Sequence, residues 1–363
     1  MDRLPLRRLV SGPLPSPDRV FFSSIWFEGH NNPRYAELLP RLSRLDRYLL
    51  VASDRRIVRG VQYRAYRASR GVRNPVLLRL ASRRYRGMFT ADPEQIRWFD
   101  GPVVADVDDP YYTQEHVDLL NRPNLLAYVV TAERAARRYE ELGVRKPFHV
   151  IPQGISFSSL RDELVAEARA RKGDDVVVGW MAAWLLADGD RGAEGPLYNI
   201  DHLLELWTGI HREAPHTRLW LIGEPSDRVR TALAGRDDVV LWGRLPRDRA
   251  LSTAASFDIA LYARTEDTGI QAAKVGELIG LGVPTVSYDY RVTENLRELG
   301  AGVLVGTPDE FVAAVVRLAT DGSARGTLAD AARRAGRDLD WDVLARRYEE
   351  ILATYMPPGS SGT

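Results

Sequence analysis

The stretch 262–287, YARTEDTGIQAAKVGELIGLGVPTVS, holds the residues whose chemistry is most informative. A strand is expected to end at its start, and a helix is expected over residues 271–281. The N-terminus of such a helix presents free N–H groups and the positive end of its dipole, and both favour a phosphate. Gly269 lets a diphosphate approach the backbone closely. Thr268, Gly269 and Ile270 are therefore candidates to hold a diphosphate.

Lys274 and Glu277 stand three residues apart, which places them on one face of this expected helix. The lysine ammonium can meet phosphate oxygens, and the carboxylate one turn deeper can accept hydrogen bonds from both hydroxyls of a ribose. The same spacing also describes an ordinary surface ion pair, which stabilises a helix by roughly 0.2–0.5 kcal/mol. The spacing alone leaves both interpretations open.

A second group of acids follows the expected strand at residues 102–106. Asp108 or Asp109 could orient or deprotonate a hydroxyl, and a carboxylate there would stabilise an oxocarbenium-like centre. The alternative is a solvated loop or a helix cap. Residues 106–108 and 188–190 also form D-x-D patterns, which are typical of a divalent-metal site in one class of transferase.

Short β-branched or aromatic runs alternate with amphipathic helical patterns along most of the chain. This alternation predicts parallel sheets with right-handed helical crossovers. A polar stretch at 154–175 separates two such blocks, so we expect two Rossmann-like α/β domains facing a cleft. The expected strands are 20–26, 48–52, 102–106, 126–130, 148–151, 176–180, 218–222, 239–242, 257–262, 283–287 and 301–305, and clear helical patterns lie at 132–142, 200–212 and 341–355.

Length and composition bound the class of protein. The 363 residues suit two domains rather than one. The absence of cysteine excludes disulfides and thiolate metal sites. The start MDRLPLRRLV has no long apolar region, and the longest uncharged apolar stretch, 176–187, is too short to span a bilayer. We therefore expect a cytoplasmic protein.

The net charge of +1 hides an asymmetry, because residues 1–170 carry 28 basic and 20 acidic side chains whereas the remainder carries 22 and 29. Residues 55–86 hold eleven arginines and no acid, with tyrosines and leucines between them. Such a segment can lie on an anionic membrane surface, where each cation contributes about 1 kcal/mol. A solvated helical face is the plain alternative, and nucleic acid is a less favoured partner that we do not expect.

Common catalytic signatures are missing from the sequence. There is no G-x-S-x-G, no H-E-x-x-H, no Walker motif and no G-x-G-x-x-G after a strand. The six histidines are scattered without metal-ligand spacing. The missing G-x-G-x-x-G disfavours a dehydrogenase.

Several motifs in the right order resemble the GT-B glycosyltransferases, especially the retaining group 1 class called family 4. Residues 274–286, KVGELIGLGVPTV, are similar to their donor-site helix, K-x-x-E-Y-x-A-x-G-x-P-V-V. Residues 150–155, VIPQGI, resemble their V-I-P-N-G-V/I, residues 221–223 resemble I-x-G, and residues 241–245 resemble F-x-G-x-V/L. The likeness covers most of residues 126–355, whereas the first 100 residues match only in layout.

The resemblance implies roles for particular residues. Glu277 falls on the carboxylate that binds the donor ribose, Lys274 and the backbone at 268–270 would hold the diphosphate, and Arg244 lies in a donor-domain motif. The loop after the first strand, with Gly29 and His30, would approach the donor phosphates or the acceptor, although a lone loop histidine is more often merely solvated. Asp108 or Asp109 would face the acceptor.

Two departures from the family pattern concern the donor. The first glutamate of its E-x7-E pair would fall on Gly269, so this chain is a variant. The usual G-R…K-N diphosphate clamp instead has Trp180 after Gly179, then an insertion with Arg191 and finally Asn199.

The resemblance implies an acceptor-binding domain at 1–155, a nucleotide-sugar-binding domain at 156–340, a helix at 341–356 crossing back to the first domain, and a disordered tail at 357–363. The expected activity is transfer of a sugar from a nucleoside-diphosphate-sugar to an acceptor hydroxyl, with retention and without a metal or other cofactor. The acceptor is a glycan, a lipid-linked molecule or a small molecule, and residues 55–86 could hold the enzyme on the inner face of the membrane. A nucleotide-sugar epimerase, a metal-dependent transferase and a non-catalytic membrane- or polyanion-binding protein are the alternatives.

Overall fold

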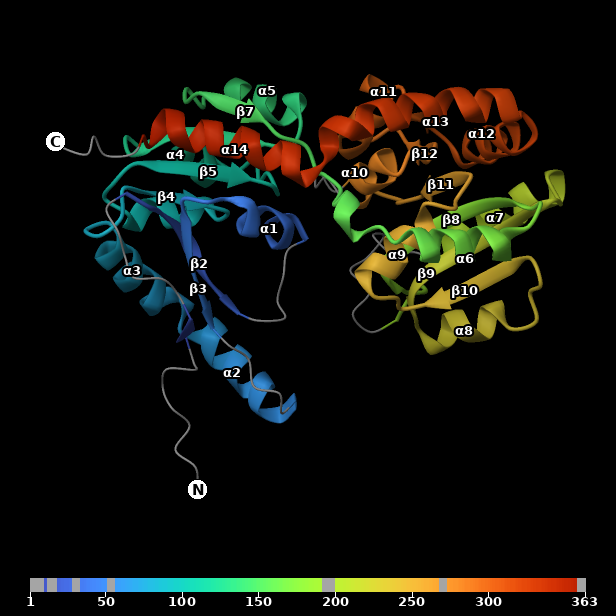
Figure 1. The fold of residues 1–363 in the computed structure, drawn as a ribbon, viewed down its shortest axis with the longest axis horizontal. Helices are drawn as coiled ribbons and strands as arrows, with labels where there is room; N and C mark the ends of the chain where they lie inside the picture. The colour runs from blue at the N-terminus through green and yellow to red at the C-terminus, as the bar shows by residue number, and fades with distance from the viewer. Residues whose placement is uncertain are drawn as a thin grey trace. The chain divides into compact units, whose positions relative to one another are not determined.

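The computed structural model describes residues 10–11, 18–27, 33–50, 56–190, 200–267 and 273–357. The chain divides into two compact units, each built on its own sheet (Figure 1). Unit 1 comprises residues 1–152 and 342–363, and unit 2 comprises residues 153–341. The expected boundaries were 155/156 and 340/341. Helices and strands alternate along both units, as the sequence predicts for an α/β protein.

Unit 1 contains a seven-stranded sheet in the order β1-β3-β2-β4-β5-β6-β7. The strands β2 to β7 run parallel, and the short β1 pairs antiparallel with β3 at one edge. Central strands such as β5 and β6 read as nearly continuous apolar runs, because helices cover a parallel sheet on both faces. The strands are β1 (Val10–Ser11), β2 (Val20–Phe27), β3 (Leu45–Leu50), β4 (Gly87–Thr90), β5 (Val103–Val107), β6 (Leu125–Val130) and β7 (Phe148–Val150).

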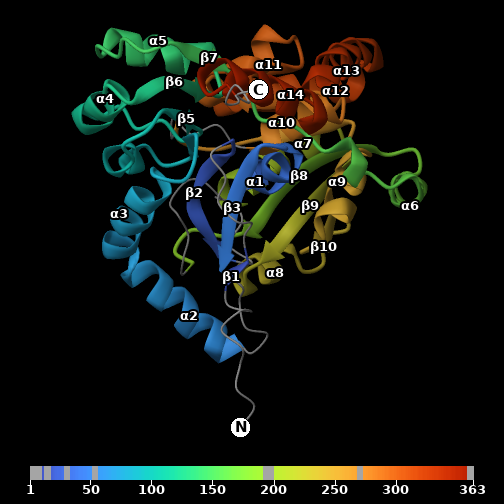
Figure 2. The same cartoon turned by 60° about the vertical axis from the view of Figure 1, so that its left-hand side comes forward.

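The helices of unit 1 surround this sheet, while α2 extends away from it (Figure 2). Helix α5 ends as the sequence predicts: the N–H of Gly143 donates to the carbonyl of Glu140 at 3.0 Å, and Gly143 has a φ of +99°. A side chain would be strained in that left-handed region, so glycine suits the position. The helices are α1 (Pro33–Leu38), α2 (Arg56–Ala68), α3 (Arg70–Ala81), α4 (Gln114–Leu120), α5 (Glu133–Glu141) and α14 (Trp341–Tyr355).

Helix α14 belongs to unit 1 from Asp342 onward. Its apolar stripe is buried, with Leu344, Tyr348 and Leu352 completely inaccessible to solvent. Met356, just after the helix, packs against Gly87 so closely that an added Cβ would lie 2.1 Å from the methionine sulfur. The last segment of the chain thus completes the core around the first sheet.

Unit 2 contains a six-stranded, wholly parallel sheet in the order β10-β9-β8-β11-β12-β13. The order reverses between β8 and β11, and ligands of open parallel sheets bind at the carboxyl ends of strands beside such a switch point. The strands are β8 (Val176–Leu185), β9 (Thr217–Pro225), β10 (Val239–Gly243), β11 (Ile259–Tyr262), β12 (Thr285–Tyr288) and β13 (Gly302–Val305).

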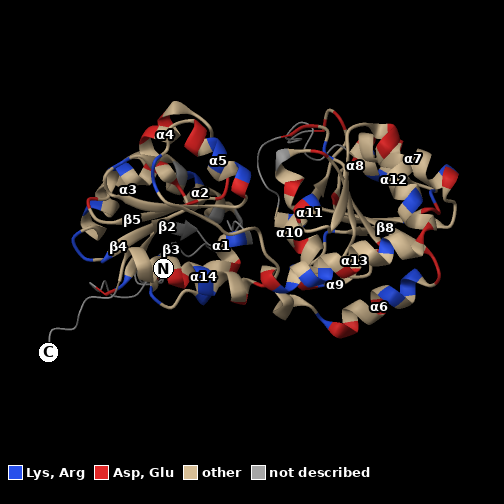
Figure 3. Ribbon diagram, turned by 90° about the horizontal axis from the view of Figure 1, so that it is seen from above, with Lys and Arg blue, Asp and Glu red and all other residues tan. Residues whose placement is uncertain are grey.

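The helices of unit 2 cover both faces of its sheet. Helix α6 occupies the polar stretch 154–175 that separates the two blocks in the sequence, and it carries acids in its first turn and bases in its last, as its dipole favours (Figure 3). The helices are α6 (Asp162–Lys172), α7 (Ile200–Glu213), α8 (Asp227–Leu233), α9 (Arg247–Ala254), α10 (Ala273–Gly280), α11 (Glu294–Glu298), α12 (Pro308–Thr320) and α13 (Gly322–Gly336).

Two strands were missed in the sequence, and β8 and β9 were both predicted too short. The four residues of β4 follow an arginine-rich helix and are too few to show a period. Strand β4 nevertheless lies inside the sheet between β2 and β5, and all four of its residues are buried. Strand β1 has two residues, which are also too few to show a period, and it was missed for that reason. Strand β8 continues to Leu185, beyond the predicted end at residue 180, through a register shift between Met181 and Trp184.

Candidate functional site

Helix α10 packs unusually close to neighbouring backbone, and this close packing fixes its position. A Cβ added at Gly276 would lie 2.3 Å from the carbonyl oxygen of Gln153, and one at Gly280 would lie 2.4 Å from Ile155. Gly336 in turn approaches Gly280, since its added Cβ would lie 2.8 Å from that Cα. The glycines of the KVGELIG motif therefore hold α10 against residues 153–155, the second half of the VIPQGI motif.

Glu277 is buried in this helix and meets an arginine from another element. Only 6% of the residue is exposed, and its Oε1 lies 2.8 Å from Nη1 of Arg247 at the start of α9. The pairing holds the carboxylate in one orientation. It also shows that Glu277 and Lys274 do not form an isolated surface ion pair, which was the plain interpretation of their spacing.

Lys274 lies one turn before Glu277 in a desolvated environment. Burial, followed by the nearby positive charge of Arg264, lowers the pKa of Lys274 to about 8 although Glu277 acts in the opposite direction. Its ammonium lies 5.7 Å from the ring centre of Trp180, at the middle of β8. Arg264, just after β11, is only 7% exposed, and its guanidinium lies 5.1 Å from the ring centre of Tyr262.

Of the other donor-side candidates, the structure describes Arg244 alone. Arg244 is exposed in the loop after β10, and its guanidinium lies 5.6 Å from the ring centre of Trp184. Thr268, Gly269 and Ile270 lie outside the described residues, as do Gly29 and His30 in unit 1 and the insertion 191–199. What is described brings Lys274, Glu277, Arg247 and Arg264 together, and all of these belong to unit 2.

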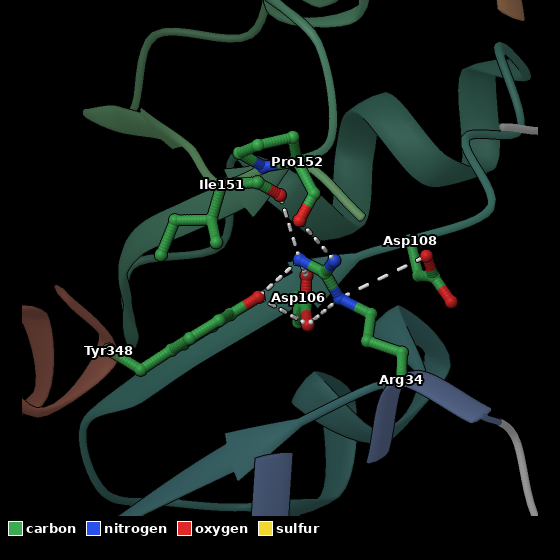
Figure 4. A network of polar contacts seen from close by, with 6 residues as sticks. All are labelled: Arg34, Asp106, Asp108, Ile151, Pro152 and Tyr348. Atoms are coloured by element: carbon green, nitrogen blue, oxygen red, sulfur yellow. Dashed lines mark hydrogen bonds and ion pairs between the residues drawn. The ribbon is translucent and has the colours of Figure 1, made fainter. Parts of the chain in front are cut away.

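In unit 1, Asp106 is the centre of a buried polar network rather than part of an open D-x-D motif (Figure 4). Its carboxylate accepts from Arg34 Nε at 2.9 Å and from the Tyr348 hydroxyl at 2.8 Å. Arg34 also donates to the carbonyl oxygens of Ile151 and Pro152 at 3.0 and 3.1 Å. The network thus joins α1, β5, α14 and the segment after β7.

Asp108 and Asp109 lie beside this network. Asp108 is 7% exposed and 4.0 Å from Arg34, and Asp109 is half-buried. Both line a cavity of about 500 Å³ in unit 1 that also contains Asp92, Glu94 and Glu115, the aromatic residues Tyr35 and Tyr111, and His116. Burial raises the pKa of Asp109 and lowers the pKa of the His116 ring. A cavity of this size lined by carboxylates can accept hydrogen bonds from several hydroxyl groups.

The second D-x-D pattern also serves the local backbone. Asp190 accepts a hydrogen bond from the Ala187 N–H at 2.6 Å and so closes the turn at 187–190. Within the described ranges, no group of three or more His, Cys, Asp or Glu side chains is arranged to hold a metal ion. Over the same ranges, no helix is both long and apolar enough to cross a bilayer.

Sequence reasoning missed Arg34, Arg247 and Arg264. The chain has 50 basic residues, so the residue type alone did not distinguish these three arginines from the others. Arg264 follows a strand at the same edge of the sheet as Lys274, which is the one positional hint that could have identified it. The buried state of Arg34 (1% exposed) follows only from the packing of α14.

Comparison with known proteins relates part of the chain to one family. Residues 191–321 match the family model described as glycosyl transferases group 1. A curated protein of Xenopus tropicalis, glycosyltransferase 1 domain-containing protein 1, is 25% identical over 219 residues, which cover 58% of this chain and 62% of that protein. The aligned part therefore spans less than two thirds of the relative's length.

Solved structures are similar over nearly the whole chain. Anabaena HepE in complex with UDP has a TM-score of 0.67 at 14% identity, covering 93% of this chain and all of that one. WaaG, a glycosyltransferase of lipopolysaccharide biosynthesis, has a TM-score of 0.61 at 12% identity, covering 94% and 100%. At such identities the likeness shows the fold. The chain therefore has the GT-B fold of these glycosyltransferases, and its residues 191–321 match the group 1 glycosyl transferase family.

Proposed function

We propose that the chain transfers a sugar from a nucleoside-diphosphate-sugar to an acceptor hydroxyl, with retention of configuration and without a metal ion. The observation that carries this proposal is Glu277, a buried carboxylate held by Arg247 and lying one helical turn after the partly buried cation Lys274. A carboxylate only accepts hydrogen bonds, which suits the two hydroxyls of a ribose, and the adjacent lysine suits the phosphates.

In the proposed reaction, the bond between the anomeric carbon and the β-phosphate oxygen breaks and a bond to the acceptor oxygen forms. The negative charge remains on the departing nucleoside diphosphate, where Lys274 stabilises it without a metal. The acceptor binds in the carboxylate-lined cavity of unit 1. Burial raises the pKa of Asp109, which makes its carboxylate a stronger base for the acceptor's proton.

The first experiment is calorimetric titration of UDP, GDP, ADP and dTDP into the wild-type protein with a chelator present. UDP is the first choice because similar structures carry UDP or UDP-glucose. We expect binding of one nucleotide, unaffected by the chelator and weakened in Glu277→Ala. Glu205→Ala, which removes an exposed carboxylate on α7, is the matched control and should bind normally. Failure of a folded wild-type sample to bind any nucleotide would refute the proposal.

Activity distinguishes the remaining alternatives. With the donor sugar identified, a transferase consumes donor only when an acceptor is present. Isomerisation of the donor without an acceptor would instead identify an epimerase, and loss of turnover with a chelator would identify a metal-dependent enzyme. NMR of the product shows the configuration at the anomeric carbon. Inversion would contradict the proposed retention and leave the proposed sugar transfer intact.

We further propose that helices α2 and α3 dock on an anionic membrane surface. Val72, Val76 and Leu80 are exposed by 76%, 56% and 52% and follow one another at intervals of four residues, so they form an apolar stripe along α3. Ile57 and Val61 on α2 are exposed by 83% and 63%. Apolar residues in solvent within a segment of eleven arginines and no acids fit a surface that is both apolar and negatively charged.

Vesicle sedimentation tests this surface. We expect the wild type to bind vesicles containing phosphatidylglycerol more strongly than pure phosphatidylcholine vesicles, and salt to weaken the binding. The triple variant Val72→Ser, Val76→Ser and Leu80→Ser should lose vesicle binding while it keeps nucleotide binding. Equal binding by this variant would contradict the assignment, and retention on DNA without vesicle binding would point to nucleic acid instead.

A further inference from the structure

The cavity of unit 1 that would hold the acceptor is lined by carboxylates from three separate parts of the chain. Glu94 lies in the segment after β4, Asp109 follows β5, and Glu115 lies in the first turn of α4. Asp92 and Asp108 line the same cavity. Among the described residues that line it, none is a lysine or an arginine. The cavity therefore presents negative charge from several sides.

Two arginines beside the cavity offset this charge only in part. The guanidinium of Arg34 is directed at Asp106 and at two backbone carbonyls, and its Nε lies 2.9 Å from the Asp106 carboxylate but 4.0 Å from Asp108 (Figure 4). Arg97 pairs with Glu115 at 2.7 Å. The five lining carboxylates and Asp106 make six anions against these two cations, so this group of side chains keeps a net negative charge.

Tyr111 gives the cavity an aromatic surface. The residue is 55% exposed although it lines the cavity. Its ring meets the His116 ring edge to face, with the ring centres 5.3 Å apart, and its carbonyl oxygen accepts a hydrogen bond from the Tyr139 hydroxyl at 3.2 Å. These two contacts hold the residue in place. An aromatic ring beside carboxylates suits an ammonium group, through cation–π attraction and charged hydrogen bonds.

The carboxylates are arranged for an organic cation rather than for a metal ion. Within the ranges that the structure describes, no three acidic or histidine side chains converge as metal ligands. A volume of about 500 Å³ holds a ligand built on a ring. Negative charge that is spread around such a volume attracts a cationic ligand and repels a phosphate.

We propose that this cavity selects an acceptor whose sugar or cyclitol ring carries an amino group, and that it disfavours a phosphorylated acceptor. The inference rests on the proposed function, since it names the acceptor class of the same site. Tyr111 contacts the ring and its ammonium group, and Glu94 accepts hydrogen bonds from that ammonium. Asp109 comes from a different element and remains for the hydroxyl that reacts. Tyr111 and Glu94 are thus specificity-determining residues.

Ligand-observed NMR titrations of the full chain test this preference without requiring turnover. The ligands are methyl glucosaminide, methyl N-acetylglucosaminide, methyl glucoside and glucose 6-phosphate, each titrated with and without UDP slightly below neutral pH, where the amine is protonated. We expect the glucosaminide to bind about tenfold more tightly than the two neutral glycosides, and glucose 6-phosphate to bind most weakly. Added salt should reduce the preference, because it screens exposed charges.

Variants identify the residues that set the preference. Glu94 is exposed, so Glu94→Gln leaves the core intact, and it should reduce the preference for the glucosaminide over the glucoside by about threefold or more. Tyr111→Ala should weaken both ligands, whereas Tyr111→Phe should retain them. Glu141→Gln is the matched control, because it removes an exposed carboxylate of α5 that pairs with Arg138 away from the cavity. The ratio of two affinities does not depend on the fraction of folded protein.

The two proposals fail in different ways. If wild type binds UDP but shows no preference for the glucosaminide, binds glucose 6-phosphate best or binds none of the four ligands, the amino-acceptor inference is refuted and the glycosyltransferase proposal stands. A preference that Glu94→Gln leaves unchanged would refute the role of Glu94. If wild type binds no nucleoside diphosphate, the proposed function itself is refuted, whatever the preference among the sugars.

Discussion

Nη1 of Arg247 lies 2.8 Å from Oε1 of Glu277, so an arginine at the N-terminus of α9 holds the carboxylate assigned to the ribose. The guanidinium is 39% exposed whereas the carboxylate is 8% exposed, so the pair extends from the interior to the surface. In the proposed donor site, Arg247 is thereby a positioning residue for Glu277.

The Arg247–Glu277 pair predicts non-additive effects on binding. Glu277→Gln should weaken uridine binding by about tenfold or more, because it removes a charged acceptor for the ribose hydroxyls. Arg247→Gln should weaken it less, since the carboxylate remains. In the double variant the losses should not add, because Arg247 acts through Glu277. Calorimetry with uridine measures this cycle, and additive losses would show that Arg247 contacts the ligand independently.

Nucleotide binding should depend on the protonation of Lys274. Its pKa in the folded protein is about 8, below the ordinary value of 10.5. A bound diphosphate favours the charged lysine, so affinity should be highest below pH 8 and fall by up to about tenfold per pH unit above it. UDP titrations between pH 7 and 10 test this. Lys274→Met should remove the dependence, whereas Lys172→Met, which breaks an ion pair with Asp258 elsewhere in unit 2, should retain it.

The free energy of unfolding should also depend on the protonation of Lys274, but it should rise with pH whereas nucleotide affinity falls. Between pH 8 and 10.5 the unfolded chain holds a proton at Lys274 that the folded chain has lost. The free energy of unfolding therefore gains a contribution that rises with pH across this window and is absent below pH 8. Urea unfolding of wild type and Lys274→Met at pH 8 and pH 10 isolates this contribution. A difference between the two proteins that does not change with pH would contradict it.

Asp109→Asn should abolish transfer and yet stabilise the fold slightly. Burial raises the pKa of Asp109, so the folded protein retains its proton at pH values where the unfolded chain has lost it. Stability therefore falls as pH rises through that window, and asparagine, which stays neutral, avoids the loss at pH 7. Thermal unfolding should show a raised midpoint, while UDP binding stays normal and turnover is lost. Unchanged turnover would exclude Asp109 as the base.

The buried network of Arg34 should be essential to unit 1. Arg34→Met leaves the Asp106 charge buried without its main partner, which should destabilise the unit by about 3–5 kcal/mol. Tyr348→Phe removes one hydrogen bond to Asp106 and should destabilise it by about 1–3 kcal/mol. The milder control is Tyr355→Phe. Tyr355 lies on the same helix as Tyr348, and its hydroxyl contacts His149. Urea unfolding measures all three, and equal effects of the two tyrosine variants would contradict a special role for Tyr348.

The close packing of α10 predicts opposite effects for two glycine-to-alanine changes in unit 2. Gly276→Ala places a methyl group 2.3 Å from the Gln153 carbonyl oxygen and should destabilise the unit by about 1–3 kcal/mol. Gly326→Ala, in the middle of α13 with open space around it, should stabilise by about 0.5–1 kcal/mol. Thermal unfolding distinguishes them, and a neutral Gly276→Ala would show that α10 can move away from residues 153–155.

The sequence by itself determined the α/β class and the order of most elements. Buried parallel strands must be apolar along their length and helices must show a period near 3.6, so local pattern suffices to locate β5, β6, α5 and α14. It also placed Lys274 and Glu277 on one helix face, because residues three apart on a helix share a face whatever the rest of the fold does, whereas their proposed roles came from the family resemblance.

Only the tertiary structure decided which charges meet. Strand β4 is central although its four residues have no readable period, because its neighbours β2 and β5 supply the ladder on both sides. Arg34 and Tyr348 are 314 residues apart in sequence and still share Asp106. Arg247 and Arg264 reach the α10 residues from different elements. Electrostatic contacts depend on distance in space, and no local pattern encodes a distance between segments that only the packed core brings together.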